Sequence, residues 1–260
     1  WLESHVDRLA DILLSPSDRD DSDACAPLPP IESIGCEGLS IRYAPSLPRI
    51  LSEVNLKVSR GEWITIVGSS GEGKSTLVKT ITGLMIPEEG TLRLDGQPTS
   101  WQSTKRLRRW VGAVMQNDGL FAGSIRDNIT LFDEHADIFA MERCAVLAEI
   151  SDDIARMPMK YESLVGEQGA GLSAGQGQRL MLARALYKQP SFLILDEFTS
   201  NIDEESEARI IANIKQIGVG VIAIAHRSHV INAADRVYEL KEGRLNARIE
   251  RSLCRTSLQA

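Results

Sequence analysis

The apolar residues of positions 1–14 recur at helical spacing with charged residues between them, which predicts an amphipathic helix. Its apolar positions are Val6, Leu9, Ile12 and Leu13. Residues 15–30, SPSDRDDSDACAPLPP, are acidic and rich in proline, so we expect an extended linker there rather than part of a core. Globular structure is therefore expected to begin near Ile34.

Beyond Ile34, short apolar runs predict strands that lead into a glycine-rich turn and a helix. The expected strands are GLSIRY (38–43), LSEVNLKVS (51–59) and the buried EWITIVG (62–68). KSTLVKTITGLM (74–85) has the pattern of a helix that glycines open. A strand that leads through a glycine turn into a helix is the first unit of a parallel α/β fold, so the expected fold class is α/β.

Two more buried strands are expected much later in the chain, FLILDE (192–197) and GVIAIAH (220–226). Each ends in polar residues, and the ligands of an open parallel sheet collect at that end of its strands. Residues 123–190 have a mostly helical pattern and are expected to form a separate lobe.

The composition narrows the classes of function. Of the 260 residues, 43% are hydrophobic, which is enough for one large domain or two small lobes. The 29 Lys+Arg and 36 Asp+Glu give a formal charge of −7, which argues against nucleic acid as a partner. The 4 cysteines form no CxxC pair, so neither zinc nor disulfides are expected. The most apolar stretch, residues 218–225, is far shorter than the ~20 residues of a membrane-spanning helix, so the isolated domain is expected to be soluble.

GSSGEGKST fits the phosphate-binding pattern G-x-x-x-x-G-K-[ST], and it follows an apolar strand and precedes a helix, as that pattern requires. Backbone N–H groups of such a loop curl around an anion at a helix N-terminus. Lys74 is expected to reach the β- and γ-phosphates, and the Ser75 hydroxyl to ligate Mg²⁺. A glycine turn that binds nothing is the alternative. The candidate nucleotide-binding residues are Gly68, Ser69, Ser70, Gly71, Glu72, Gly73, Lys74, Ser75 and Thr76.

Hydrolysis of a triphosphate also needs a second magnesium ligand and a group that positions water. LILDE supplies both, with Asp196 for the metal and Glu197 to orient or deprotonate the attacking water. His226 ends the third strand and can donate a hydrogen bond to the γ-phosphate. Without the phosphate loop upstream, the two acids would be a solvated strand end and the histidine a structural residue.

Taken in order, the motifs resemble the nucleotide-binding domain of ATP-binding cassette (ABC) transporters over about residues 36–246. The matching pieces are Tyr43 in IRYAPS, the phosphate loop, Gln116 in VMQND, the signature LSAGQ, the pair in LDE, the D-loop SNID and the H-loop AHR. The resemblance implies that Tyr43 stacks on adenine, and that Gln116 touches magnesium and the attacking water as a third catalytic residue beside Glu197 and His226.

The resemblance also implies a P-loop NTPase fold of the ABC type, with a RecA-like core and an N-terminal antiparallel β subdomain. A helical subdomain would be inserted at about 118–190 of the domain at 34–246. Residues 1–33 would be the end of a transmembrane-helix tail and a linker, and residues 247–260 a C-terminal tail. The implied cofactors are ATP and Mg²⁺.

The signature stretch GLSAGQGQRLMLAR contains no catalytic group, and the resemblance explains its purpose. In this family two domains pair head to tail, and the signature turn of one covers the γ-phosphate held by the other. Ser173 and free N–H groups at a helix N-terminus form an anion site; an ordinary serine-capped helix start is the alternative. The matching nucleotide-contact positions of the signature and D-loop are Ser173, Gly175, Gln176 and Asp203.

Two positions depart from the family's usual LSGGQ and SALD, and a third departs just after the signature. Ala174 and Asn201 replace a glycine and an alanine, and neither change removes a group that the site needs. Gly177 stands where the family usually carries a basic residue, and a glycine there is expected to weaken the first turn of the helix.

LFAGSIRDNI (120–129) and YESLVGEQGAGLS (161–173) resemble the exporter form, in which the region of Glu167 abuts the coupling helices of the membrane domain. The N-terminal stretch is most similar to bacteriocin and colicin V type exporters that carry a cysteine-peptidase domain. The implied function is ATP-driven export of a substrate such as a bacteriocin peptide across the bacterial inner membrane. The domain would act at the cytoplasmic face, with a second copy of itself and the transmembrane domain of the same exporter as partners.

A soluble ABC protein and a simple P-loop kinase are the alternatives to an exporter. A soluble ABC protein could act as a nucleotide-gated clamp on DNA or ribosomes, but the acidic charge, the lack of a long coiled coil or second cassette and the VGEQG stretch argue against it. A simple P-loop kinase would leave the signature turn without a purpose.

Overall fold

The computed structural model describes residues 29–44, 46–99, 105–166 and 171–248. The expected amphipathic helix and the acidic linker up to residue 28 lie outside these residues, as does Glu167. Among the described residues, no helix combines the length and the apolar character needed to cross a membrane.

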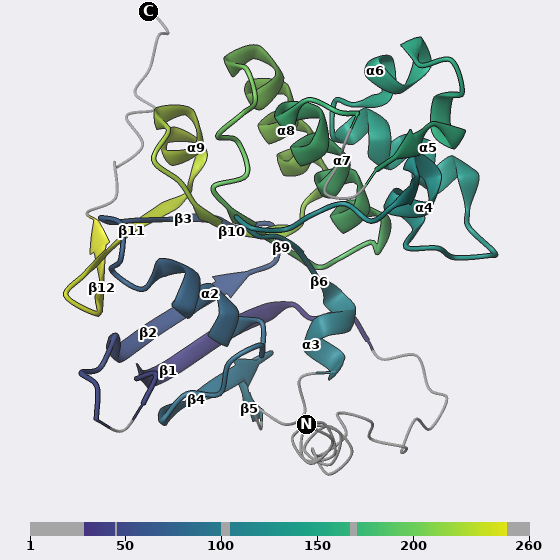
Figure 1. Cartoon of the computed structure of the whole chain (residues 1–260). Helices are drawn as coiled ribbons and strands as arrows, with labels where there is room; N and C mark the ends of the chain where they lie inside the picture. The colour runs from purple at the N-terminus through teal and green to yellow at the C-terminus, as the bar shows by residue number, and fades with distance from the viewer. Residues whose placement is uncertain (1–28, 45, 100–104, 167–170, 249–260) are drawn as a thin grey trace, which may run out of the picture.

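Two sheets form the body of the molecule (Figure 1). The antiparallel sheet has the order β2-β1-β4-β5, with β1 (Ser33–Ile41), β2 (Leu51–Ser59), β4 (Glu89–Leu94) and β5 (Gln97–Thr99). The larger sheet has the order β12-β11-β3-β10-β9-β6. Its parallel strands are β3 (Trp63–Val67), β6 (Val111–Val114), β9 (Phe192–Asp196), β10 (Gly220–Ile224) and β11 (Arg236–Lys241), and its antiparallel edge is β12 (Arg244–Arg248).

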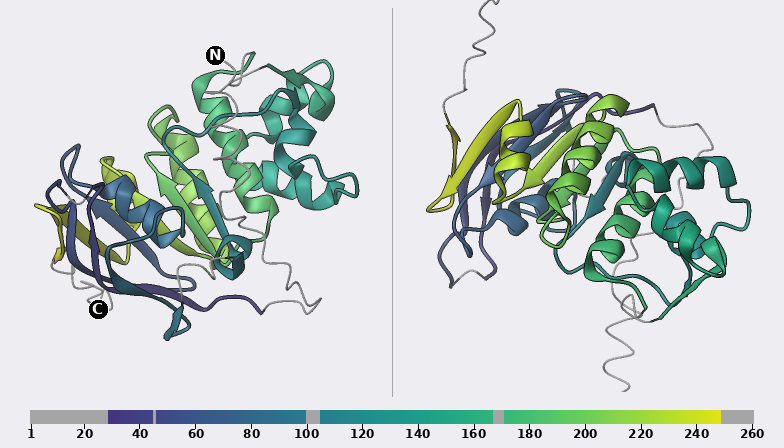
Figure 2. Two further views of the ribbon diagram at one scale, coloured as in Figure 1. Left: turned by 60° about the horizontal axis from the view of Figure 1, so that its bottom comes forward. Right: turned by 90° about the horizontal axis from the view of Figure 1, so that it is seen from above.

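The helices divide into those that pack on the parallel sheet and those of a separate lobe. Figure 1 shows α2 between the two sheets, with α8 and α9 on the opposite face of the parallel sheet. These elements are α2 (Lys74–Ile81), α3 (Lys105–Trp110), α8 (Glu204–Ile217) and α9 (Ser228–Ala233). The helical lobe lies beside the sheets (Figure 2) and contains α4 (Ile125–Thr130), α5 (Ile138–Leu147), α6 (Ser151–Arg156), the 3₁₀ turn η2 (Lys160–Glu162) and α7 (Ala174–Tyr187).

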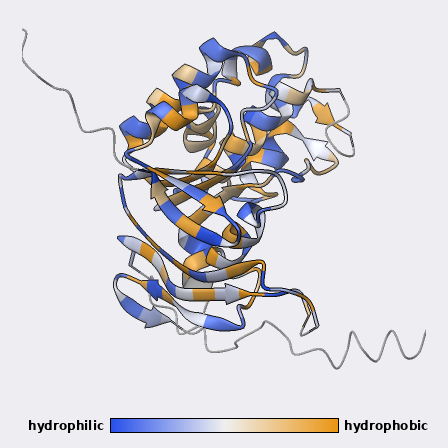
Figure 3. Cartoon of the chain, turned by 90° about the vertical axis from the view of Figure 1, so that its left-hand side faces the viewer, coloured by the Kyte–Doolittle hydropathy of each residue, from blue (hydrophilic) through white to orange (hydrophobic). Residues whose placement is uncertain are grey.

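Alternate side chains of the parallel strands feed two hydrophobic cores. Ile64 of β3 and Ile194 of β9 pack with α2 and the antiparallel sheet, whereas Trp63 and Leu193 pack with the lobe and α8. Because both faces of these strands are covered, their sequences read as continuous apolar runs. In the antiparallel sheet, hydrophobic and hydrophilic residues alternate along the strands instead (Figure 3).

The expected α/β fold with a helical lobe is confirmed, and several boundaries differ. Strand β1 begins at Ser33 rather than at residue 38, because residues 33–37 pair with both β2 and β4. Helix α2 ends at Ile81 rather than at residue 85, since Gly83 adopts a left-handed backbone (φ 71°). The lobe also contains a two-stranded pair, β7 (Gly123–Ser124) with β8 (Leu164–Val165), which the helical pattern did not indicate.

Candidate functional site

The phosphate-loop turn connects β3 to α2, and at two of its glycines any side chain would be strained. Gly68 has a φ of 154°, and a Cβ there would lie 2.4 Å from the carbonyl oxygen of Leu240. Gly73 is the N-cap of α2 with a φ of 95°, and its Cβ would meet Ile50 at 2.7 Å. No side chain caps α2, so the N–H groups of its first turn are available for an anion.

Lys74 lies inside this turn rather than in solvent. Its side chain is 7% exposed, and Nζ donates hydrogen bonds of 2.8 Å to the carbonyl oxygens of Gly68 and Ser69. Ser69, Ser70 and Gly71 form the exposed rim of the loop above it. The ammonium group is therefore held where a phosphate bound in the loop would meet it.

Ser75 and Asp196 form the candidate magnesium site. The Ser75 hydroxyl donates to Oδ2 of Asp196 at 2.9 Å, and Asp196 is 2% exposed at the end of β9. Burial raises the pKa of Asp196, and the hydrogen bond from Ser75 opposes this rise. A hydroxyl and one carboxylate are hard oxygen ligands that suit Mg²⁺, which commonly takes its other ligands from water and substrate phosphates. Within the described part of the chain, no cluster of three or more His, Cys, Asp or Glu offers a complete metal site.

Glu197 is contacted by the two other candidate catalytic residues. The Gln116 side-chain amide donates to Oε2 of Glu197 at 2.9 Å, and Nε2 of His226 lies 3.3 Å from Oε1. Gln116, Glu197 and His226 follow β6, β9 and β10, which are neighbours in the sheet and end at the same edge. Glu197 has a left-handed backbone (φ 51°), which is uncommon for a residue with a side chain.

Two predicted nucleotide contacts have partners within the protein. Tyr43 is 60% exposed, and its hydroxyl lies 2.9 Å from Oγ1 of Thr76, so the ring stands beside the start of α2 with its surface open to solvent. The carboxylate of Glu72 accepts a hydrogen bond of 2.7 Å from the backbone of Glu242, in the turn between β11 and β12. Glu72 therefore contributes its backbone, and not its side chain, to the phosphate loop.

The signature turn begins α7 with Ser173 as an exposed N-cap. Ser173 and Gln176 form a capping box, with bonds of 3.0 Å and 3.2 Å between each side chain and the other's backbone N–H. Gln176 also donates to Asp153 at 3.0 Å. Gly175 packs directly on the D-loop, since a Cβ there would lie 2.5 Å from the carbonyl oxygen of Asn201.

The D-loop ends at Asp203, which caps α8. Its carboxylate accepts a hydrogen bond of 2.9 Å from the backbone N–H of Ser206, and this bond lowers the pKa of Asp203. The cap is a structural role that uses Oδ1, one of the two carboxylate oxygens of Asp203.

Two residues that the sequence analysis did not single out connect these motifs. Gln178 of α7 donates to Oγ of Ser200 at 2.9 Å and accepts from the backbone of Asn201 at 3.1 Å. Arg227 donates to the carbonyl oxygens of Ile202 at 2.7 Å and Ser200 at 3.1 Å. Their only signal in the sequence is position, since Gln178 follows the signature and Arg227 follows His226.

The two stretches expected of an exporter lie side by side. Strands β7 and β8 pair residues 123–124 with residues 164–165, and the backbone of Ile125 donates to that of Ser163 at 3.0 Å. The residues around Glu167 follow directly but lie outside the described residues.

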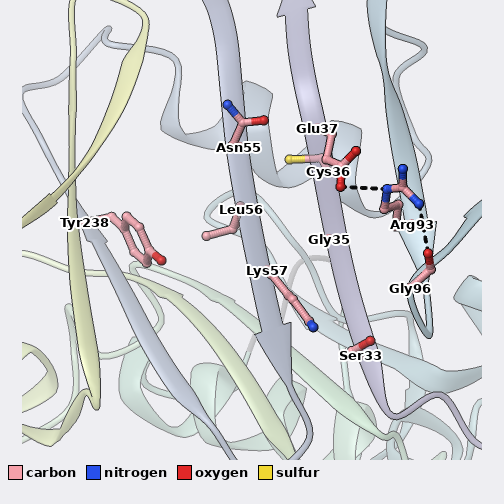
Figure 4. Close-up of a pocket in the computed structure, with 10 residues that line it drawn as sticks. All are labelled: Ser33, Gly35, Cys36, Glu37, Asn55, Leu56, Lys57, Arg93, Gly96 and Tyr238. Atoms are coloured by element: carbon pink, nitrogen blue, oxygen red, sulfur yellow. Dashed lines mark hydrogen bonds and ion pairs between the residues drawn. The ribbon is translucent and has the colours of Figure 1, made fainter.

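A cavity of about 530 Å³ lies elsewhere, against β1, β2, β4 and β11 (Figure 4). An ion pair of 2.8 Å joins Glu37 and Arg93 at its side. None of the candidate site residues lines this cavity, so it is separate from the nucleotide site.

A phosphate loop between β3 and α2, a buried lysine inside it and an Asp-Glu pair at the end of β9 define a nucleoside-triphosphatase domain of the P-loop class. The model of the ABC transporter family matches residues 51–200, more than half of the chain. The chain belongs to this family, whose ATP-binding domains are ATPases coupled to transport.

Relatives include a probable microcin-H47 secretion/processing ATP-binding protein of Escherichia coli, 40% identical over 91% of this chain and 34% of its own length. The colicin V secretion/processing ATP-binding protein of Escherichia coli is 41% identical over the same shares. A toxin RTX-I translocation ATP-binding protein of Actinobacillus pleuropneumoniae is 43% identical over 92% of this chain and 34% of its own length. The chain thus spans about a third of the length of these relatives.

Among solved structures, a bacterial Atm1-family ABC exporter with ATP bound superimposes with a TM-score of 0.83 at 31% identity, covering 92% of this chain and 42% of that one. The ABC ATPase fold, predicted from the motifs, and the resemblance to bacteriocin-type exporters, predicted from the N-terminal stretch, are thereby confirmed.

Proposed function

We propose that this chain is the ATP-hydrolysing domain, residues 34–246, of an exporter that moves a peptide such as a bacteriocin across the bacterial inner membrane. The observation that carries the proposal is the meeting of Gln116, Glu197 and His226 at the sheet edge where Ser75 and Asp196 also lie. In the part of the chain that the structure describes, the side chains that contact the Glu197 carboxylate are those of Gln116 and His226, which suits a carboxylate that takes a proton from water.

Different residues of the chain bind the phosphates, the adenine and the magnesium ion. Lys74 and the first-turn N–H groups of α2 hold the β- and γ-phosphates, and Tyr43 offers its exposed ring to adenine. Mg²⁺, held by Ser75 and Asp196 with Gln116 nearby, would neutralise developing phosphate charge. Glu197 orients the attacking water, and His226, whose Nε2 lies 3.3 Å from Oε1 of Glu197, donates to the γ-phosphate.

Two copies of the domain pair head to tail, so that Ser173 of one covers the phosphates bound by Lys74 of the other. The exposed position of Ser173 at the N-terminus of a fourteen-residue helix supports this arrangement, because such a terminus attracts an anion. Asp203 and the D-loop, which pack against the same helix end, would lie at the contact between the copies. Loss of the γ-phosphate on hydrolysis removes the charge that Ser173 binds, and the dimer opens.

The relatives' names support the export function and the partners. Each of the three names a secretion or translocation ATP-binding protein, and they carry about twice as much additional chain as this one contains. We infer a transmembrane domain of the same exporter as partner, and a location at the cytoplasmic face of the membrane. These names favour an exporter over a soluble clamp.

Complementation between two inactive variants tests the shared site. Lys74→Ala and Ser173→Arg are each expected to abolish turnover when alone. In a mixed dimer one site carries both changes and the other carries neither, so the mixture should recover ATPase activity to about a quarter of the wild-type rate. Inactivity of the mixture at every ratio, with both variants folded, would refute a site built from two copies.

A further inference from the structure

Glu207 is a buried carboxylate on α8 that the nucleotide site does not use. It is 1% exposed, and within the described residues its Oε1 has no hydrogen-bond partner. Two side chains that follow β10 approach it, because Arg227 lies 3.7 Å from Oε1 and Nδ1 of His229 lies 3.4 Å from Oε2. Burial of a carboxylate costs free energy, so we expect a functional reason for the position of Glu207.

Arg227 contacts both Glu207 and the D-loop and so connects them. While its charge faces Glu207, two of its nitrogens donate to the carbonyl oxygens of Ser200 and Ile202. A guanidinium group can bridge in this way because its donors point along fixed directions in one plane. The D-loop is bound on its other side by Gln178 of the signature helix.

The same arrangement bears on His226. This residue directly precedes Arg227, and its Nε2 lies 3.3 Å from the carboxylate of Glu197. Glu207 contacts Arg227 and His229, which lie one and three residues after His226, so it holds the chain directly after His226. Loss of the Glu207 charge would leave Arg227 and His229 without this partner.

We propose that Glu207 is a positioning residue for ATP hydrolysis: through Arg227 it holds the D-loop and the His226 segment in one fixed arrangement, so that signature turn, D-loop and H-loop move as a unit. This inference rests on the proposed function of the chain as an ATPase that works as a head-to-tail dimer. Glu207 does not touch nucleotide itself, so it should govern the rate of hydrolysis rather than the binding of ATP.

Replacement of Glu207 by an uncharged residue of the same shape tests the proposal. Glu207→Gln is expected to lower kcat by about 10- to 100-fold, because small misplacements of reacting groups cost that much, while KM for ATP and the affinity of the monomer for nucleotide stay within about twofold. Arg227→Lys keeps a positive charge near Glu207 but cannot bridge both D-loop carbonyls, and it should lower kcat in the same way. The double variant should be no slower than the slower single variant, since both act through one contact.

Glu205→Gln is the matched control, because Glu205 lies two residues away on the same helix with its side chain 84% exposed. It should leave kcat unchanged. A lower melting temperature of Glu207→Gln with unchanged kcat would overturn the inference, and so would multiplying effects in the double variant. If Glu207→Gln does not fold, Arg227→Lys decides by the first criterion: an unchanged kcat with a lower melting temperature overturns the inference.

The wild-type domain, measured in parallel, separates this inference from the proposed function. A wild-type protein without ATPase activity, or with a specific activity independent of protein concentration, contradicts the proposed function. Normal wild-type kinetics together with normal kcat in both Glu207→Gln and Arg227→Lys contradicts only the positioning role.

Discussion

Two glycines of the signature helix, Gly175 and Gly177, should respond in opposite directions to the same substitution. Both lie in the first turns of α7, and Ala174–Tyr187 is helical throughout. A Cβ at Gly175 would lie 2.5 Å from the carbonyl oxygen of Asn201. At Gly177 the nearest atom to a Cβ is Cδ1 of Leu120, at 4.0 Å. We therefore compare Gly175→Ala with Gly177→Ala.

The expected magnitudes follow from these contacts. Alanine is more favourable than glycine in a helix interior by about 0.5–1 kcal/mol, and Gly177→Ala should gain this in full because nothing obstructs its methyl group. Gly175→Ala has the same gain, but 2.5 Å is shorter than side-chain carbons approach an oxygen, and the obstacle is backbone. Forcing such a contact costs about 1–3 kcal/mol, so Gly175→Ala should be destabilising overall.

Thermal denaturation followed by circular dichroism measures both variants. A change of 1 kcal/mol shifts the melting temperature of a domain of this size by about 2–4 °C, so the two variants should differ by several degrees. In ATPase assays Gly177→Ala should keep wild-type turnover, whereas Gly175→Ala should slow it, because the D-loop is displaced. Equal shifts of melting temperature in the two variants would refute the reasoning, since it depends on the contact with Asn201.

Three further outcomes are expected. Lys74→Ala should weaken nucleotide binding about 10- to 100-fold in equilibrium titration, because charged hydrogen bonds are worth about 1.5–3 kcal/mol; unchanged affinity would contradict the phosphate contact. Glu197→Gln should lower kcat about 10²- to 10⁴-fold and accumulate an ATP-bound dimer in size-exclusion chromatography, and a purely monomeric elution would argue against it. The pKa of Asp203 is lowered by the Ser206 N–H, so the stability from its charge is complete above about pH 4, the unfolded value, and is lost as pH falls through the lower folded value. In urea unfolding, the stability of Asp203→Asn should depend less on acid pH than that of the wild type. Asp203→Ala should lose about 0.5–2 kcal/mol of stability, because it removes the N-cap. If the stability of the wild type and of Asp203→Asn falls identically with pH, the charge of Asp203 does not contribute to stability.

Local sequence patterns were enough to predict the central strands and the phosphate loop. Strands β3, β9 and β10 are buried on both faces, so each appears as an unbroken apolar run, and the polar residues that end them lie at one sheet edge as expected. Strand β6 was missed because Gly112 interrupts a run of only four residues. That glycine is needed there, since a Cβ would lie 2.7 Å from the carbonyl oxygen of Ala185 in α7.

The contacts among motifs could not be predicted in the same way. Gln178 reaches Ser200, and Arg227 reaches both Ser200 and Glu207, only because α7, α8 and the end of β10 converge in space. The Glu72 carboxylate turns toward Glu242 for a similar reason, because β11 runs beside β3. Such contacts depend on tertiary packing, which the spacing of residues along the chain does not encode.

The left-handed backbone at Glu197 has a consequence for how this domain can change. A glycine at this position would relieve the local strain, so selection for heat resistance alone would favour replacing the carboxylate that the proposed hydrolysis requires. Variants selected in that way would be more resistant to heat but unable to hydrolyse ATP. A screen for thermostable variants of the domain should therefore measure ATPase turnover as well as heat resistance.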